Sequence, residues 1–438
     1  MLNNDIRTFR NDEAMTHSSP LLRTFHLVLL CLLLGVCTGC TGGVPFWKSQ
    51  VSSATPPPEM TTGVATTAAT SPPSHPSVTA EPAVLSRTAE PLPRPRQPRS
   101  SRFSESIDYT YHKRILTEDT TWRGQVLIEG SLTIAPQATL FITPGTRVRF
   151  RPSPGEGAGL LLIRGRIQAI GTKDSPITLT SDEINPAPGD WQGIMVFDSI
   201  KKNLLEWCRV DFAVTGITAE FSELALRQTT ISHSRTGVVL LSSSVVITGG
   251  GAADCMTGFS SRYGDADLGG VRFSGNHRGI TVNGGSLLLS ASEVTGSEES
   301  AVEATGARLR IEGSSFVRNG AGMTLTKCRG DLFGNRIEEN RTVGLEFTES
   351  PLRITGNRIT GNRGTGVVIR SGGGSLWENN LEGNGEGALA VTGTEDVAAP
   401  GNWWGSANPD RIRGLIRAGV ANGMVLFTPY QEVPPSFP

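Results

Sequence analysis

A glycine followed by an apolar residue recurs at nearly fixed spacing through much of the chain. Apolar residues occupy the first and third positions after each glycine, as Ile280 and Val282 do after Gly279. Such alternation indicates a short strand with one buried face. The members of the series, 21 to 23 residues apart and with alanine once in place of glycine, are Gly193, Gly216, Gly237, Gly258, Gly279, Ala301, Gly322, Gly344, Gly366 and Gly387.

Two further apolar sets keep the same period. One lies six or seven residues before the glycine, as Phe316 and Ile337 do, and the other lies eleven to fourteen before it, as Leu309 and Leu352 do. Each period therefore predicts three short strands. A unit this short cannot bury a core alone, but stacked coils bury continuous ladders of side chains. With the irregular alternation over residues 126–150, the pattern predicts an all-β parallel β-helix of about twelve coils.

Other repeat folds fit the pattern less well. A leucine-rich repeat has a similar period, but its leucine–asparagine consensus and helical segments are missing here. A propeller needs a period of about 40–45 residues. Few stretches have helical periodicity, so a helical bundle is also disfavoured.

Asparagines repeat in two rows of the same period. Because asparagine tolerates left-handed backbone geometry, we expect both rows at corners of the coil. Stacked amides can also hydrogen-bond from one coil to the next. The two rows are Asn335, Asn357 and Asn379, and Asn319, Asn340, Asn362 and Asn384.

The ends of a β-helix need caps, since an open end exposes unpaired strands. At the C-terminal end, Asn408 and Pro409 are a typical helix start. We expect residues 406–430 to form a lid and residues 107–121 to cover the first coil. The expected lid elements are a helix with Ile412, Leu415 and Ile416 on its apolar face and Gly419 at its end, a strand with Val425 and Phe427, and cap packing by Trp403 and Trp404.

The N-terminal region carries an export signal. About ten apolar residues at Leu27–Val36 are too few to span a membrane, which needs roughly 20, and suit a secretory leader. The sequence Cys37–Cys40 that follows resembles the lipobox of bacterial lipoproteins, although Cys37 stands where that motif usually has leucine. This predicts a signal peptide over 1–39 and lipidation at Cys40; the alternative is a signal peptide cut without lipid. Acidic residues before Met15 suggest that translation begins there.

A tether and a folded domain follow. Residues 41–106 hold twelve of the chain's 27 prolines, with serine and threonine between them. Such a composition cannot bury enough apolar area to fold. We therefore expect a disordered linker over 40–106, a β-helix domain with caps over 107–430 and a C-terminal tail over 431–438.

The net charge and the cysteine content exclude some functions and some kinds of stabilisation. The formal net charge is −1, which does not support nucleic-acid binding. Of the six cysteines, Cys31 and Cys37 leave with the leader and Cys40 is acylated. The remaining Cys208, Cys255 and Cys328 are widely spaced and odd in number, so we expect packed thiols rather than a disulfide framework.

Several short motifs resemble one family. These are Trp122–Gly124, Pro144–Thr146, Trp191–Ile194, the Gly-Asn-x-Ile coils and the closing Gly401–Gly405. Over about residues 107–430 the chain resembles the right-handed parallel β-helix repeat proteins of bacterial cell envelopes, of the pectin-lyase-like superfamily. The resemblance implies the handedness of the coil. That superfamily includes polysaccharide lyases and hydrolases, carbohydrate-binding repeats and a copper-site maturation protein, so fold does not select a function.

A candidate ligand surface lies on the strands after each repeat glycine, whose second and fourth residues should face outward. By the same rule Leu389 and Val391 face outward in the last coil. Polar side chains in regular rows suit the repeating hydroxyls of a glycan. The candidates are Glu220, Arg262, Asn283, Glu303, Thr324, Glu346 and Arg370.

Catalysis is less well supported. Calcium-dependent lyases need several converging carboxylates, and this face lacks them. Glu303 and Glu346 lie two coils apart, about 9.6 Å from the strand spacing, at the edge of the range of about 6.5–9.5 Å used by inverting glycosidases. No catalytic residue is therefore assigned, and no cofactor is expected.

One corner could hold a metal ion. His233 and Asp254 both lie four residues before their glycine, so they should stack, with Cys255 and His277 close by. These residue types bind transition metals, although their spacing matches no known zinc motif.

Three functions stay open. The first is a monomeric, membrane-anchored lipoprotein of the cell envelope, facing the periplasm or in the outer membrane, that binds polysaccharide without catalysis. The second is a polysaccharide lyase or glycoside hydrolase, and the third a periplasmic metal-handling accessory factor.

Overall fold

The computed structural model describes residues 106–152, 158–419 and 423–436. The chain divides into two units, residues 1–90 and 91–438, and the described residues belong to the second. The predicted signal peptide, the lipidation site Cys40 and nearly all of the predicted linker lie outside them. Within the described ranges, no helix is long and apolar enough to cross a membrane.

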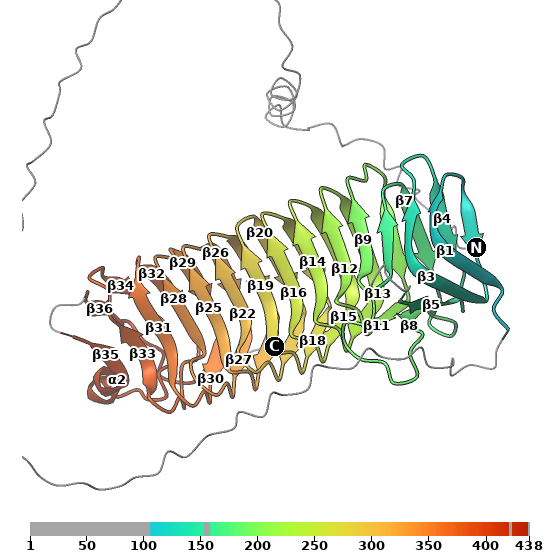
Figure 1. Cartoon of the computed structure of the whole chain (residues 1–438). Coiled ribbons are helices and arrows are strands. Elements are labelled where there is room, and N and C mark those ends of the chain that lie inside the picture. The colour runs from blue at the N-terminus through green and yellow to red at the C-terminus, as the bar shows by residue number, and fades with distance from the viewer. Residues whose placement is uncertain (1–105, 153–157, 420–422, 437–438) are drawn as a thin grey trace, which may run out of the picture. The chain divides into compact units, whose positions relative to one another are not determined.

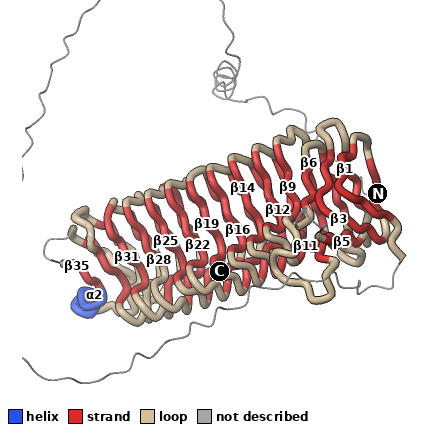
Figure 2. Tube along the Cα trace, viewed as in Figure 1, coloured by secondary structure: helices blue, strands red, loops and turns tan. Residues whose placement is uncertain are grey.

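The domain is a right-handed parallel β-helix of about 13 turns, close to the twelve expected from the repeat. Figure 1 shows the coils stacked from the N-terminal end, in blue, to the C-terminal end, in red. Figure 2 shows that strands and short loops make up almost all of the described chain, with one helix at the C-terminal end. Most coils contribute one strand to each of three parallel sheets, as the three apolar sets predicted.

The first sheet contains the strands that follow the repeat glycines. Its strands are β6 (Leu160–Ile163), β9 (Gly193–Phe197), β12 (Thr215–Glu220), β14 (Thr236–Leu241), β16 (Thr257–Arg262), β19 (Arg278–Asn283), β22 (Ser300–Thr305), β25 (Ala321–Thr326), β28 (Leu345–Thr348), β31 (Thr365–Ser371), β33 (Gly387–Val391) and β35 (Ile416–Ala418).

The second sheet comes next along each coil. Its strands are β2 (Thr120–Trp122), β4 (Thr139–Ile142), β7 (Arg166–Ile170), β10 (Asn203–Glu206), β17 (Asp265–Gly269), β20 (Ser286–Ser290), β23 (Arg308–Glu312), β26 (Arg329–Phe333), β29 (Leu352–Thr355), β32 (Gly374–Trp377), β34 (Val397–Ala398) and β36 (Val425–Leu426).

The third sheet closes each coil, and four long strands bend between sheets. The third-sheet strands are β5 (Arg147–Arg151), β8 (Ile177–Ser181), β11 (Cys208–Asp211), β18 (Arg272–Ser274), β21 (Glu293–Thr295), β24 (Ser315–Val317), β27 (Arg336–Glu338) and β30 (Arg358–Thr360). The bent strands are β1 (Tyr109–Leu116) and β3 (Gln125–Ile134), between the third and first sheets, and β13 (Glu223–Ser232) and β15 (Ser244–Ala253), between the second and third.

The core is a set of ladders in which like positions stack. Ile337 lies between Phe316 and Ile359 in the third sheet, and all three side chains are fully buried. Ile280 and Val282 are likewise buried in the first sheet. The inward assignments from the repeat are therefore confirmed. Near the N-terminal end, the core contains a stacked aromatic pair, Phe150 and Trp191, with ring centroids 3.9 Å apart.

The asparagine rows hydrogen-bond between coils as predicted, but the asparagines do not have the left-handed backbone that was expected at the corners. The amide of Asn335 donates to the side-chain oxygen of Asn357 at 3.0 Å, and the rows extend to Asn276 and Asn402. None of these asparagines is left-handed. The left-handed residue is the one before, such as Gly361 (φ 66°) or Glu339 (φ 55°). The turn thus points each asparagine inward, where its side chain pairs with the backbone of the previous coil.

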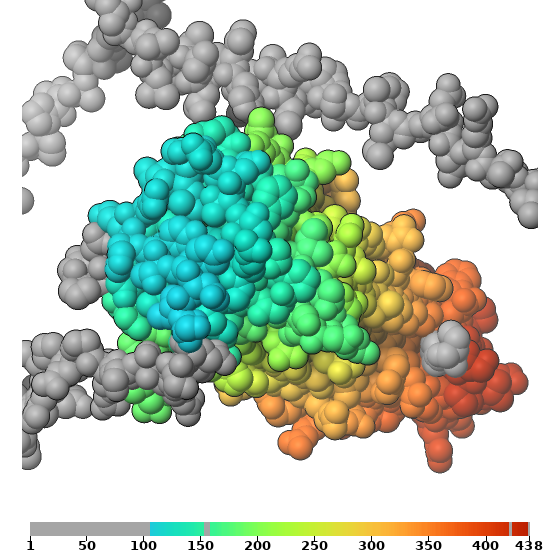
Figure 3. All heavy atoms as spheres, turned by 90° about the vertical axis from the view of Figure 1, so that its right-hand side faces the viewer, coloured from blue at the N-terminus to red at the C-terminus, as the bar shows by residue number. Residues whose placement is uncertain are grey.

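Caps close both ends of the coil. Figure 3 looks onto the N-terminal end, where the blue residues form a closed surface. Here Trp122 is buried and its indole N–H donates to the Tyr111 hydroxyl at 3.1 Å. At the other end, Asn408 caps helix α2 (Pro409–Leu415), as predicted. The helix ends at Leu415 rather than at Gly419, because the chain continues directly into β35, which pairs with β33.

The last coils contain a shift of register. Val367 and Ile369 pair with Leu389 and Val391, so both of the latter side chains are buried. The prediction that Leu389 and Val391 face outward is therefore wrong. It assumed that the last repeat glycine stacks on the one before it, whereas Gly387 pairs with Thr365, one residue before Gly366, so the second and fourth residues after Gly387 face inward.

Candidate functional site

The outward-facing side chains of the first sheet form straight rows, because its strands pair in register. One row runs through Thr281, Glu303, Thr324 and Glu346 on successive coils. The neighbouring row runs through Arg262, Asn283 and Thr305. Successive members of a row are separated by the strand spacing of about 4.8 Å. The sheet therefore presents polar groups at a fixed repeat, which suits an extended polymer.

The two rows meet in a hollow of about 330 Å³ over β16, β19 and β22. Three predicted residues line it, namely Arg262, Asn283 and Glu303. Arg278, which the sequence analysis did not select, also lines it. The hollow further exposes hydroxyl groups from Thr257, Ser260, Thr281 and Thr305. Charged and uncharged hydrogen-bonding groups thus lie together within a short stretch of the sheet.

Ion pairs fix the charged groups at the rim of the hollow. The Arg278 guanidinium pairs closely with Glu299 and lies 4.0 Å from a carboxylate oxygen of Glu303. The hydrogen bond from Arg278 holds the pKa of Glu299 below its ordinary value, and Glu299 in turn raises the pKa of Arg278. Both groups are thus charged at neutral pH.

The other predicted ligand residues do not join the hollow. Glu220 lies between Phe197 and Leu241 in its row, two coils before Arg262. Thr324 continues the row beyond Glu303. Glu346 pairs with Arg370, whose pKa it raises. Arg370 sits at an irregularity where Phe347 pairs with Ile369 but Thr348 pairs with Ser371. The seven residues share one face, but the structure brings together three of them.

The two carboxylates considered for catalysis are separated. Glu303 and Glu346 lie two coils apart in one row, with Thr324 between them. Each carboxylate has an arginine as its neighbour, Arg278 for Glu303 and Arg370 for Glu346. These ion pairs hold each carboxylate against its own arginine rather than against the other carboxylate.

Tyr263, like Arg278, is a residue near this site that sequence reasoning missed. Its side chain is 67% exposed, directly after Arg262 and at the corner between the first and second sheets. The ring lies over Gly284 in the next coil, where a Cβ atom would be 2.6 Å from the tyrosine Cδ1. The ring therefore lies beside the residue that follows Asn283, at the end of the strand that lines the hollow. The available signal was a tyrosine followed one coil later by the glycine pair Gly284 and Gly285.

The predicted metal corner is partly assembled. His233 and Asp254 do stack on adjacent coils, with His233 Nε2 4.0 Å from Asp254 Oδ2. Both have left-handed backbones, with φ of 48° and 54°. The imidazole also stacks on Phe212, with ring centroids 5.4 Å apart.

Cys255 and His277 have other partners. Cys255 is buried, its thiol donates to the Ala253 carbonyl at 3.2 Å, and burial raises its pKa to about 11. The ring nitrogens of His277 lie 2.7 and 3.0 Å from oxygens of Glu298 and Glu299. Within the described residues, no three His, Cys, Asp or Glu side chains are placed to hold a metal ion.

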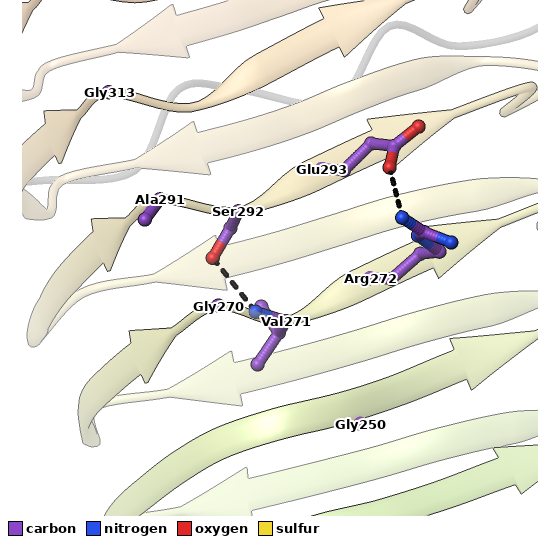
Figure 4. Close-up of a pocket in the computed structure, with 8 residues that line it drawn as sticks. All are labelled: Gly250, Gly270, Val271, Arg272, Ala291, Ser292, Glu293 and Gly313. Carbon is purple, nitrogen blue, oxygen red and sulfur yellow. Dashed lines mark hydrogen bonds and ion pairs between the residues drawn. The ribbon is translucent and has the colours of Figure 1, made fainter.

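A second hollow lies at the corner that follows the glycine triplet Gly249–Gly251. It has a volume of about 370 Å³, and Figure 4 shows it lined by small residues from successive coils, including Gly250, Gly270 and Ala291. Its polar groups pair with one another. The Val271 N–H donates to the Ser292 hydroxyl at 3.1 Å, and Arg272 lies 2.9 Å from Glu293. These groups are therefore less available to a ligand than those of the first sheet.

Two family models match parts of the chain. A model described as "Right handed beta helix region" matches residues 256–403, and one described as "Pectate-lyase like beta helix domain" matches residues 114–224. No curated protein matches the chain by sequence.

Solved structures with the same kind of fold also match. A crystal structure of the periplasmic alginate epimerase AlgG is 13% identical, with 70% of this chain and 74% of that chain covered and a TM-score of 0.21. A double mutant of the same enzyme is 14% identical, with 70% and 75% covered and a TM-score of 0.27. At these values the likeness does not bear on the activity of the present chain.

Proposed function

Since this chain is a right-handed parallel β-helix protein, we propose that it binds polysaccharide, without cleaving it, along the outward face of its first sheet. The hollow formed by Arg262, Asn283 and Glu303 beside Tyr263 carries the proposal. The leader-like segment and Cys40 support a place in the cell envelope with a lipid anchor. We take the protein to act as a monomer.

The chemistry of the hollow fits sugar hydroxyls. A hydroxyl both donates and accepts hydrogen bonds, so it can pair with the Arg262 guanidinium, the Asn283 amide or the Glu303 carboxylate. Tyr263 adds an apolar ring face with a polar tip, on which the C–H face of a sugar ring can stack. Ligand sites typically combine apolar contact with a few convergent polar groups.

The rows beyond the hollow support an extended ligand. Thr305, Thr326 and Thr348 follow Asn283 on successive coils. A polymer lying along the coil axis therefore meets an equivalent hydroxyl at every coil, about 4.8 Å apart. Binding that is weak at each coil adds up along such a ligand, so affinity is expected to rise with glycan length.

Binding of the full-length protein to a panel of purified cell-wall and extracellular glycans tests the proposal. We expect Tyr263→Ala and Asn283→Ala each to weaken binding by about tenfold, since the first removes the proposed stacking ring and the second removes an amide that lines the hollow. Arg353→Gln is the control, because Arg353 is exposed on the second sheet.

Three results would contradict the proposal. The first is equal binding by all three variants and the unaltered protein, and the second is binding to no glycan at all. The third is steady release of new reducing ends or unsaturated products from the bound polymer, which would show a hydrolase or a lyase instead.

A further inference from the structure

Ile200 is held almost entirely in solvent. Its side chain is 99% exposed, in the corner between β9 and β10. This corner is longer than the equivalent corner of the next coil, between β12 and β13. Phe197 pairs with Glu220, and Asn203 pairs with Leu224. The step from Phe197 to Asn203 is six residues, whereas the equivalent step from Glu220 to Leu224 in the next coil is four. Two extra residues therefore push Ile200 beyond the regular outline of the coil.

The corner is rigidly tied to the coils on both sides. The hydroxyl of buried Ser199 donates to the Gly165 carbonyl of the previous coil at 2.5 Å. The backbone N–H of Ser199 donates to the Ser222 hydroxyl of the next coil at 3.0 Å. The amide of buried Asn203 donates to the Lys201 carbonyl at 2.8 Å. Since both ends of the corner are fixed, the exposure of Ile200 is a built feature of the domain.

Cations and aromatic rings lie on the residues next to this isoleucine and on the neighbouring coils. Lys201, whose ammonium group also donates to the Gln137 carbonyl at 3.0 Å, and Lys202 follow it directly. Phe221, 59% exposed, packs edge-on against Phe197 with ring centroids 6.5 Å apart. On the other side of Phe197, the guanidinium of Arg164 lies 5.9 Å from the ring centroid and 3.6 Å from Asp198.

One outward row of the adjoining second sheet is mostly apolar. This central row runs along the register from Phe141 through Gln168 to Leu204, Ala225 and Val246. Val246 is 50% exposed. In the following coil the row becomes acidic at Asp267. The apolar row is thus confined to the coils around Ile200, near the N-terminal end of the domain, where β4, β7 and β9 lie in Figure 1.

We propose that Ile200, Phe221 and this apolar row rest on an anionic lipid bilayer, with Arg164, Lys201 and Lys202 facing its phosphate groups. Apolar side chains beside lysine and arginine are what a membrane interface accommodates, since the former enter the acyl boundary and the latter meet the negative surface. A flat sheet face several strands wide matches a flat bilayer better than a concave groove would. This contact stands apart from the proposed glycan face, which lies on the first sheet and in later coils.

Sedimentation of the protein with lipid vesicles tests the proposal. All samples are the full-length chain carrying Cys40→Ser, so that lipid on Cys40 cannot contribute. The vesicles are phosphatidylcholine with and without phosphatidylglycerol. We expect preferential binding to the anionic vesicles, a loss of about tenfold with Ile200→Ser and of about fivefold with Lys202→Gln. Met256→Ser is the control, since Met256 is 58% exposed at a different corner.

Three outcomes overturn the proposal. The first is equal binding by every variant, which would assign any vesicle binding to the apolar leader. The second is equal binding to neutral and anionic vesicles. The third is a change of oligomeric state in solution with Ile200→Ser, which would show that a second copy of the chain covers this surface. Circular dichroism of each variant verifies that the coil is intact.

Discussion

The side-chain oxygen of Asn362 accepts two hydrogen bonds from Asn340, one from its backbone N–H at 3.1 Å and one from its side-chain amide at 2.8 Å. The amide of Asn362 in turn donates to the Ile337 carbonyl and to Asn384. One side chain thus satisfies backbone groups of the coil before it while it pairs with the coil after it.

Asn362→Ala should therefore cost more than a single hydrogen bond. It leaves the backbone N–H and one side-chain N–H of buried Asn340 without partners, and each buried unsatisfied group costs about 1–3 kcal/mol. We expect a loss of about 3 kcal/mol in the free energy of unfolding, measured by urea denaturation followed by circular dichroism. The control is Asn283→Ala on the exposed face, and equal losses for the two variants would contradict the proposed role of the ladder.

Ile337→Asp should be severely destabilising. Its side chain is fully buried between Phe316 and Ile359, so the variant places an unpaired charge in the apolar ladder. We expect a loss above about 4 kcal/mol or failure to fold. Val246→Asp puts the same charge on a half-exposed outward position and should melt near the unaltered protein. Normal melting of the Ile337 variant would disprove the inward assignment.

Ser261→Ala should stabilise the protein. The serine is inward-facing between Leu240 and Val282 and buried, and its hydroxyl has no hydrogen-bond partner among the described residues. Removing an unsatisfied buried hydroxyl should raise the free energy of unfolding by about 1 kcal/mol. Ser234→Ala should instead lower the free energy of unfolding, because the Ser234 hydroxyl accepts a hydrogen bond from the Ala213 N–H at 3.1 Å. Thermal melts of the two variants should move in opposite directions.

His277 should make stability weakly pH-dependent. Its hydrogen bond to Glu298 raises its pKa above the ordinary 6.5. The folded state therefore holds the proton more tightly than the unfolded state does, so this stabilisation is complete below pH 6.5 and is lost as pH rises through the raised value. His277→Gln should remove that part of the pH profile of unfolding. In an NMR titration, Glu298→Gln should lower the His277 midpoint; an unchanged midpoint would contradict the pairing.

The coil and its core could be predicted from sequence because the repeat places like residues on like. Any apolar position in one period, such as Ile337, implies stacking neighbours 21 or 22 residues away, here Phe316 and Ile359. The stacking of His233 on Asp254 followed from the same counting. Each inference used only the period and the alternation of side chains within a strand.

Corner geometry could not be predicted in the same way. The left-handed position before each asparagine is filled by glycine at 361 but by glutamate at 339, so residue type does not mark it. The register of the last coil was also not predictable from the repeat, because Gly387 pairs with Thr365 and not with the repeat glycine Gly366.

The candidate site was predictable as a face but not as a hollow. Outward rows follow from the repeat, and they placed Arg262, Asn283 and Glu303 together. The contribution of Tyr263 depends on the open space above Gly284 in the next coil, and that of Arg278 depends on its ion pair with Glu299. Such relationships between coils involve unlike residues, which the period alone does not relate.

The asparagine ladder has a direction. Every described pair has the N–H of the earlier asparagine donating to the side chain of the later one, as Asn335 does to Asn357 and Asn379 does to Asn402. The earlier coil is synthesised first, so the N–H of its corner asparagine has no side-chain acceptor until the asparagine of the following coil is in place. Assembly that keeps pace with synthesis thus has a built-in order, and the closing helix comes last to a stack whose other corners are already complete.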